Sequence, residues 1–141
     1  MKVAVFSGRF DPPHLGHTNT ISVLAEPNDF VIVPILDYNG RVLISAEDAK
    51  QIFENVFKNI CIKNVLFIVN NIHFGKITMD QYKEMITGCG FDYNKCDVIY
   101  WSGNISVIDH MNSIGIRNVP IERSFPKIYS GTKIRESKIL Q

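Results

Sequence analysis

The most constraining feature of the sequence is a glycine turn near the N-terminus, placed between an apolar run and a helical pattern. The run from Val3 to Phe6 predicts a buried strand, because it is short, rich in β-branched residues and ended by Ser-Gly. Residues 18–25 carry apolar side chains at helical spacing. Strand, turn and helix in this order place the turn at the carboxyl end of a strand, where open α/β sheets bind ligands. The helix N-terminus favours phosphate there.

The same alternation of strand and helix continues along the chain. Further strands are predicted at residues 30–36, 65–69, 98–101 and 116–121, and further helices at 45–59, 78–86 and 105–113, with a capped helix start at 129–136. We therefore expect an α/β fold with a doubly wound, five-stranded parallel sheet of the Rossmann-like kind, in a single domain over residues 1–141.

One residue conflicts with the predicted second strand. Pro34 has no N–H to donate to a sheet ladder, so we expect this strand to be bulged or to end there.

Composition excludes several classes of protein. The formal net charge of +1 gives no broad basic field for nucleic acid, so anions must be bound by local groups. No apolar run reaches about 18 residues, so no membrane span is expected. The start of the chain lacks the pattern of a signal peptide, and the three cysteines form no C-x-x-C pair. We expect a cytoplasmic protein with free thiols.

Two histidines stand at the predicted entrance of the first helix. His14 and His17 are three residues apart, and Gly16 between them lets the backbone approach a ligand closely. This arrangement suggests imidazole donors for a charged oxyanion. On spacing alone, the pair could equally bind a metal ion or cap the helix.

A second candidate phosphate site lies near the C-terminus. Ser130, Gly131 and Thr132 stand at a predicted helix start, followed by basic Lys133 and Arg135. Hydroxyls, a glycine and positive charge at a helix N-terminus form a cradle for phosphates. Taken alone, such a pattern is more often a plain helix cap.

The full strings are more specific than either spacing. Residues 8–17, GRFDPPHLGH, resemble the G-x-F-[DQ]-P-x-H-x-G-H signature of the nucleotidyltransferase superfamily, which includes cytidylyltransferases, pantetheine-phosphate adenylyltransferase and nicotinamide mononucleotide (NMN) adenylyltransferase. Residues 130–135 resemble the S-[ST]-T-x-x-R element that closes the active site of this superfamily. Residues 98–104 and 129–135 also resemble blocks of the archaeal-type NMN adenylyltransferases, so the matches span nearly the whole chain.

This resemblance implies a nucleotidyltransferase that transfers a nucleoside monophosphate from a nucleoside triphosphate, ATP in preference to CTP, to a small phosphorylated acceptor with release of pyrophosphate. NMN is the favoured acceptor, which would make the reaction a step of NAD synthesis. Mg²⁺ would arrive on the triphosphate with few protein ligands, so no metal-binding residue is named. The resemblance also implies a homo-oligomer.

Roles follow residue by residue from the matching positions. His14, His17 and Arg135 would be catalytic, stabilising the charge that develops on the phosphates. Nucleotide binding is assigned to Ser7, Gly8, Arg9, Phe10, Gly16, Gly103, Asn104, Ser130, Gly131 and Thr132. Arg41 or Lys50 could bridge the acceptor phosphate, although a solvated charge is the commoner interpretation of each. Asp11 could contribute to the acceptor site or simply shape its turn through an Asx bond.

The chain also departs from the archaeal-type pattern. Asp11 replaces the usual glutamine and matches cytidylyltransferases and the pantetheine enzyme, the loop at residues 37–43 is short, and residues 71–79 contain no tryptophan. Trp101 or Tyr129 could stack on a base, but a core role is at least as common for a strand tryptophan. The alternatives are a cytidylyltransferase or another adenylyltransferase acting on a sugar-alcohol or pantetheine phosphate, and a nucleotide sensor without turnover. His73 and His110 stay outside the predicted site.

Overall fold

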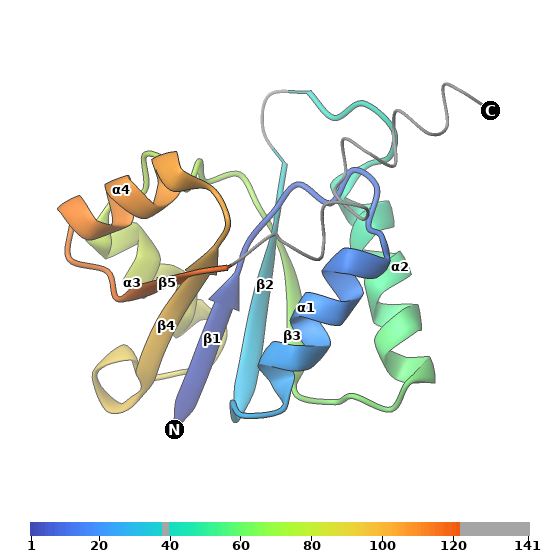
Figure 1. The fold of residues 1–141 in the computed structure, drawn as a ribbon, viewed down its shortest axis with the longest axis horizontal. Helices are drawn as coiled ribbons and strands as arrows, with labels where there is room; N and C mark the ends of the chain where they lie inside the picture. The colour runs from blue at the N-terminus through green and yellow to red at the C-terminus, as the bar shows by residue number, and fades with distance from the viewer. Residues whose placement is uncertain (38–39, 122–141) are drawn as a thin grey trace.

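The structure is a computed structural model that describes residues 1–37 and 40–121. Within these residues, five parallel strands form one sheet in the order β3-β2-β1-β4-β5 (Figure 1). Helices cover both faces of the sheet, so the expected doubly wound α/β fold is confirmed. No helix among the described residues combines the length and apolar character needed to cross a membrane.

The elements follow one another as the apolar periodicity predicted. The strands are β1 (Lys2–Phe6), β2 (Phe30–Leu36), β3 (Val65–Asn70), β4 (Asp97–Ser102) and β5 (Asn118–Pro120). The helices are α1 (Leu15–Ala25), α2 (Ala46–Asn59), α3 (Met79–Gly88) and α4 (Ile105–Ser113), with a short 3₁₀ turn, η1 (Tyr93–Lys95). The first helix begins at Leu15, ahead of the apolar pattern at residues 18–25, and His14 acts as its N-cap.

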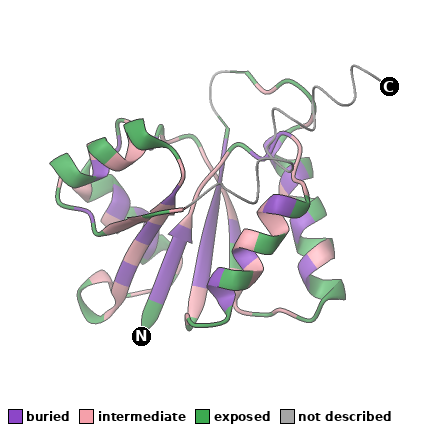
Figure 2. Ribbon diagram, in the orientation of Figure 1, coloured by how far each residue is buried: buried purple, intermediate pink, exposed green. Residues whose placement is uncertain are grey.

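The alternating side chains of the strands build a separate apolar core on each face of the sheet. Val3 and Val5 of β1 point into the core beneath α3 and α4, whereas Ala4 points into the core beneath α1 and α2. Figure 2 shows buried residues running along the central strands. Burial on both faces explains why these strands read as continuous apolar runs.

The expected break at Pro34 is wrong. β2 runs through Pro34 to Leu36, and Pro34 pairs in register with Ile68 of β3. The carbonyl oxygen of Pro34 accepts the N–H of Gly8, so the backbone of Pro34 faces β1. The β1–β2 pairing stops after Val5 and resumes at Gly8 in the same register. The proline therefore removes one bond from the ladder without bending the strand.

The strand order defines where a ligand site is expected. The chain passes from β1 to β2 and β3 on one side, and then crosses to β4 on the other side of β1. The carboxyl ends of β1 and β4 thus flank a topological switch point, the position at which open α/β sheets leave a crevice for ligands. In Figure 1 this edge is at the top, where α1 and α4 begin.

We predict that Phe53→Ala lowers the free energy of unfolding by about 3–5 kcal/mol, because Phe53 is fully buried on α2 and its ring stacks on Phe67 with centroids 5.0 Å apart. Urea denaturation measures this change. Ile52→Ala on the same helix is the matched control, since Ile52 is 42% exposed and should cost about 0.5 kcal/mol. Equal losses in the two variants would contradict this account of the core.

Candidate active site

The register of β1 and β4 brings two loops together at the switch point. Phe6 pairs with Trp101, so the chain leaves both strands at the same level. Just beyond, the Ser7 hydroxyl is hydrogen-bonded to the phenol of Tyr100 on β4. The predicted nucleotide-binding residues Ser7 and Gly103 therefore lie at one edge of the sheet.

Asn104 is the N-cap of α4. Its Oδ1 accepts the N–H groups of Ser106 at 3.0 Å and Val107 at 3.4 Å, and its own N–H donates to the Ser102 hydroxyl at 3.0 Å. These bonds fix the turn after β4, so that the N-terminus of α4, the positive end of its dipole, begins at the switch point.

His14 and His17 form a capping box at the start of α1. The N–H of Gly16 donates to Nδ1 of His14 at 3.1 Å, and the N–H of His14 donates to Nδ1 of His17 at 3.2 Å. The two rings stack with centroids 3.5 Å apart and planes 23° from parallel. A neutral imidazole whose Nδ1 accepts a hydrogen bond carries its proton on Nε2. Both rings therefore carry an Nε2–H donor.

The sequence left a metal site open as an alternative for this pair. Among the residues that the structure describes, no group of three or more histidine, cysteine, aspartate or glutamate side chains could hold a metal ion. The capping role is present, and it is compatible with donation to an oxyanion.

The ring of Phe10 packs against the ring of His17. The Phe10 ring is buried and meets His17 edge-on at 4.7 Å and Phe53 edge-on at 4.9 Å. The backbone of Phe10 has a φ of +49°, in the left-handed region that most side chains avoid. A Cβ on Gly8 would lie 2.9 Å from Cζ of Phe10, too close for a packed ring. Gly8 thus makes room for the ring on which the histidine rests.

Asp11 joins the turn after β1 to the loop before α2. Its buried carboxylate accepts the N–H groups of Val42 at 2.6 Å, and of Leu43 and Ile44 at 2.9 Å each. Burial is the largest single influence and would raise the pKa of Asp11. The three backbone N–H groups and the Arg41 guanidinium together outweigh it, so the pKa of Asp11 is lowered. The carboxylate stays ionised and holds the loop.

Arg41 completes this connection from the other side. Its guanidinium donates from Nε to the carbonyl oxygen of Ile44 at 2.8 Å, from Nη1 to that of Leu36 at 2.8 Å, and from Nη2 to that of Phe10 at 3.0 Å. Burial lowers the pKa of Arg41, and the nearby charge of Asp11 opposes this shift. Asp11 and Arg41 therefore brace two loops, and their part in acceptor binding stays a prediction.

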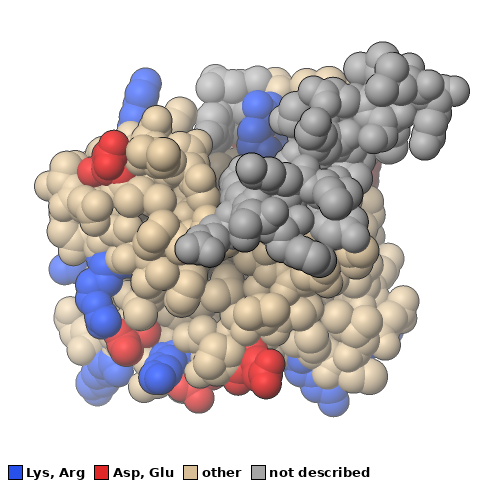
Figure 3. Space-filling view, viewed as in Figure 1, with Lys and Arg blue, Asp and Glu red and all other residues tan. Residues whose placement is uncertain are grey.

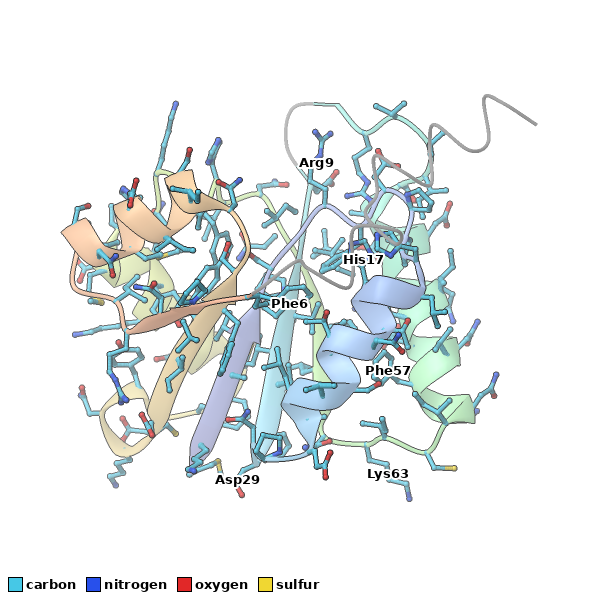
Figure 4. The ribbon with its side chains drawn as sticks, viewed as in Figure 1. Phe6, Arg9, His17, Asp29, Phe57 and Lys63 are labelled. Atoms are coloured by element: carbon cyan, nitrogen blue, oxygen red, sulfur yellow. The ribbon has the colours of Figure 1, made fainter. Side chains whose placement is uncertain are left out.

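The remaining predicted cations lie nearer to solvent. Arg9 is exposed at the carboxyl edge of the sheet (Figure 4), and its Nη2 donates to the carbonyl oxygen of Gly40 at 2.6 Å. Lys50 is half-buried on α2. Gly16, an uncharged member of the predicted nucleotide site, is buried in the first turn of α1. Figure 3 shows acidic and basic side chains intermixed at the lower margin of this face, without a large patch of one sign.

The C-terminal part of the predicted site lies outside the described residues. This concerns Ser130, Gly131, Thr132 and Arg135, together with Tyr129. That Arg135 meets His17 in one pocket stays a prediction.

Two β4 residues near the site lie in the block 98–104 that resembles the archaeal-type pattern, but the sequence did not show their contacts. Tyr100 is 1% exposed, bonds to Ser7 and stacks on Phe74 at 5.4 Å. Strand alternation can assign the face of Tyr100 but not its polar partner. Trp101 is half-buried against the core beneath α1 and α2, which favours the core interpretation. His110 lies on α4 and hydrogen-bonds the carbonyl oxygen of Ile77 at 2.7 Å.

Comparison with solved structures identifies the fold. A candidate nicotinate-nucleotide adenylyltransferase from Vibrio parahaemolyticus superposes with a TM-score of 0.67 at 19% identity, over 99% of this chain and 87% of its own. The NadR protein in complex with NAD and AMP-PNP gives a TM-score of 0.70 at 19% identity, over 97% of this chain and 42% of its own.

A bifunctional NMN adenylyltransferase/ADP ribose pyrophosphatase from Francisella tularensis, complexed with AMP and a manganese ion, gives a TM-score of 0.66 at 18% identity. The match covers 96% of this chain but 41% of the bifunctional protein, so this chain spans less than half the length of that neighbour and of NadR. No protein-family model matches the sequence, and no curated protein shows significant sequence similarity.

We predict that Asp11→Asn lowers the free energy of unfolding at pH 7 by about 1–3 kcal/mol, because the loop loses a charged acceptor for three N–H groups. The pKa of Asp11 is lower in the folded chain, so its stabilisation is present above the ordinary carboxyl pKa of about 3.9. It is lost as the pH falls through the lowered value. Urea denaturation at pH 7 and pH 3 should show the difference between wild type and variant shrinking in acid.

Asp109→Asn on the exposed face of α4 is the control and should change stability little at either pH. A difference for Asp11→Asn that is the same at both pH values would contradict an ionised brace.

Proposed function

We propose that this chain, whose fold is that of nicotinate-nucleotide and NMN adenylyltransferases, is a nucleotidyltransferase that joins a nucleoside monophosphate to a small phosphorylated acceptor. ATP and NMN are the favoured substrates, which would make the product a dinucleotide of NAD synthesis. Support comes from the neighbours, which include the NadR complex with NAD and AMP-PNP.

The observation that carries this proposal is the pair of histidines at the start of α1. Both Nδ1 atoms accept backbone N–H groups, so both protons are held on Nε2 before a substrate arrives. Donors that are oriented in advance stabilise developing charge without reorganising during the reaction. The N-terminus of α1 adds positive potential at the same place.

The reaction requires positioning and charge stabilisation rather than a covalent intermediate. A phosphate oxygen of the acceptor attacks the α-phosphorus of the triphosphate in line. The bond from the α-phosphorus to the bridging oxygen breaks, and pyrophosphate leaves with that oxygen. In this proposal the Nε2–H of His17 donates to the α-phosphate oxygens, and the Nε2–H of His14 to the neighbouring phosphate. Arg9 and Arg135 balance the remaining charge.

The divalent metal ion is best treated as part of the substrate. Asp11, the acidic residue of the motif, directs its carboxylate at three backbone N–H groups of the loop, which suits bracing rather than metal binding. We therefore propose that Mg²⁺ enters on the triphosphate. The neighbour complexed with AMP and a manganese ion supports the use of a divalent cation.

For the acceptor, a specific observation supports an alternative. The short loop before α2 is tied down by Asp11 and Arg41, so it offers fewer free side chains than a longer loop would. An acceptor without a nicotinamide ring to hold, such as a sugar-alcohol phosphate or pantetheine phosphate, is therefore the second candidate. A nucleotide sensor without turnover is the third.

We predict that His17→Ala lowers the turnover rate by about 10²–10³-fold, because one preorganised donor to the α-phosphate is lost. The variant also loses a capping bond, which costs about 1 kcal/mol of stability. His17→Gln separates the two roles, since glutamine at this helix position can still accept the His14 N–H. It should keep the wild-type melting temperature and lose most of the activity.

Pyrophosphate release measures the rate, and His110→Gln is the histidine control with activity close to wild type. If His17→Gln turned over at the wild-type rate, His17 would be a helix cap alone.

We predict ATP-dependent pyrophosphate release in the presence of NMN. The panel pairs ATP and CTP in turn with NMN, nicotinate mononucleotide, glycerol phosphate and pantetheine phosphate, each with Mg²⁺. A signal with CTP and glycerol phosphate alone would replace the first candidate by the second. No turnover on the whole panel, with nucleotide binding retained by calorimetry, would favour the sensor.

A further inference from the structure

Within the described residues, β3 forms one edge of the sheet. β3 is the last strand on its side, and its sequence VLFIVN contains no charge, proline or glycine. Natural proteins commonly protect edge strands with charges, prolines or bulges, because an open edge can pair with another chain. Short apolar segments of high β-propensity are those that pair most readily.

The backbone of β3 presents its unpaired groups in a regular series. The carbonyl oxygens of Asn64 and Asn70 accept N–H groups of Val31 and Asp37 at 2.9 Å each, so these even-numbered positions face β2. By the alternation of a strand, the backbone groups of Val65, Phe67 and Val69 face outward. Within the described part of the chain, none of these outward groups has a hydrogen-bond partner.

A groove follows the same edge. It has a volume of about 360 Å³ and is lined by Leu66 and Phe67 of β3 together with Phe57 and Lys58 of α2. Leu66 and Phe67 are neighbours in a strand, so their side chains point to opposite faces of the sheet. Of β3, Val65, Leu66 and Phe67 line the groove, so it lies at the first half of this strand. This part of the β3 edge is therefore open to solvent beside a groove.

We propose that this edge is a homodimer interface, in which β3 pairs antiparallel with β3 of a second copy about a two-fold axis at Phe67. In this register Phe67 faces the partner's Phe67, and Val65 faces the partner's Val69. Each such pair exchanges two backbone hydrogen bonds, and the two five-stranded sheets become one continuous sheet.

The segment is self-complementary in this register, which favours a second copy over an unrelated strand. The three outward positions are symmetric about Phe67, so every outward N–H finds a carbonyl. Leu66, 37% exposed in the single chain, lies opposite the partner's Ile68 on the other face. Lys63 lies opposite the partner's Asn71, so no like charges meet in the ladder.

The helix beside the edge fits the same symmetry. Glu54 and Lys58 stand one turn apart on α2 and both line the groove. A two-fold axis perpendicular to the sheet runs the partner's α2 antiparallel to this helix, so the acidic position of one copy faces the basic position of the other. In Figure 4 the labelled Lys63, at one end of the groove, lies at the opposite end of the sheet from His17.

Light scattering during size-exclusion chromatography tests the proposal. The wild-type protein should have twice the mass of the 16.0 kDa chain. Leu66→Lys places a charge on the edge, and Val69→Pro removes an outward N–H without touching the bonds to β2. Both variants should run at the mass of a single chain with wild-type circular dichroism.

Val23→Lys on α1 is the matched control, since Val23 is 68% exposed and does not line the groove. This variant should leave the dimer intact. A wild-type protein of single mass would overturn the proposal. So would a dimer that survives both edge variants, or a series of ever larger species, which would indicate an open rather than a two-fold contact.

Cross-linking tests the register. In a Cys61→Ser background, which removes an exposed thiol, one chain carries Leu66→Cys and a second carries Ile68→Cys. Directly opposed residues of this kind have Cα atoms about 4.5 Å apart, which a disulfide can span. Mild oxidation should therefore link the mixed pair and leave each chain alone largely unlinked. Equal linking of all combinations would contradict the stated register.

Discussion

The carboxylate of Asp11 is the contact on which the arrangement of the site depends. It accepts the N–H groups of residues 42–44 at the turn after β1. Arg41 donates to the carbonyl oxygens of Phe10 in that turn, of Ile44 in the loop and of Leu36 at the end of β2. A buried charge is tolerated because polar groups surround it and its partner lies close by. Phe10 precedes Asp11 in the turn and carries the ring beneath His17. The carboxylate of Asp11, the loop at residues 42–44 and the imidazole of His17 are thus positioned together.

The two histidines show that a structural and a chemical interpretation of one motif need not compete. A capping box normally uses serine or threonine with glutamate or glutamine, and here imidazole nitrogens accept both N–H groups. The same bonds that fix the start of α1 also place the proton of each ring on Nε2. A carboxylate or amide in either position would cap the helix but would not present an imidazole N–H to a phosphate.

Local periodicity was sufficient to predict the fold, but not the contacts between distant segments. The five strands and the capping box of Thr78 and Gln81 follow from neighbouring residues alone. The cap at His14 was one of the interpretations that the histidine spacing left open. The bracing role of Asp11 and Arg41 was missed because their partners lie about thirty residues away in the other loop. The part of the site formed by Ser130 and the residues after it lies beyond the described chain.

The proline in β2 has a consequence for motion. The missing bond at Pro34 divides the β1–β2 ladder into a lower part, with three residue pairs, and an upper part held at Gly8. Cooperative units of a protein open separately where few hydrogen bonds connect them. The upper part carries the turn that leads to the histidines. This turn can therefore open locally while the residue pairs below it stay hydrogen-bonded.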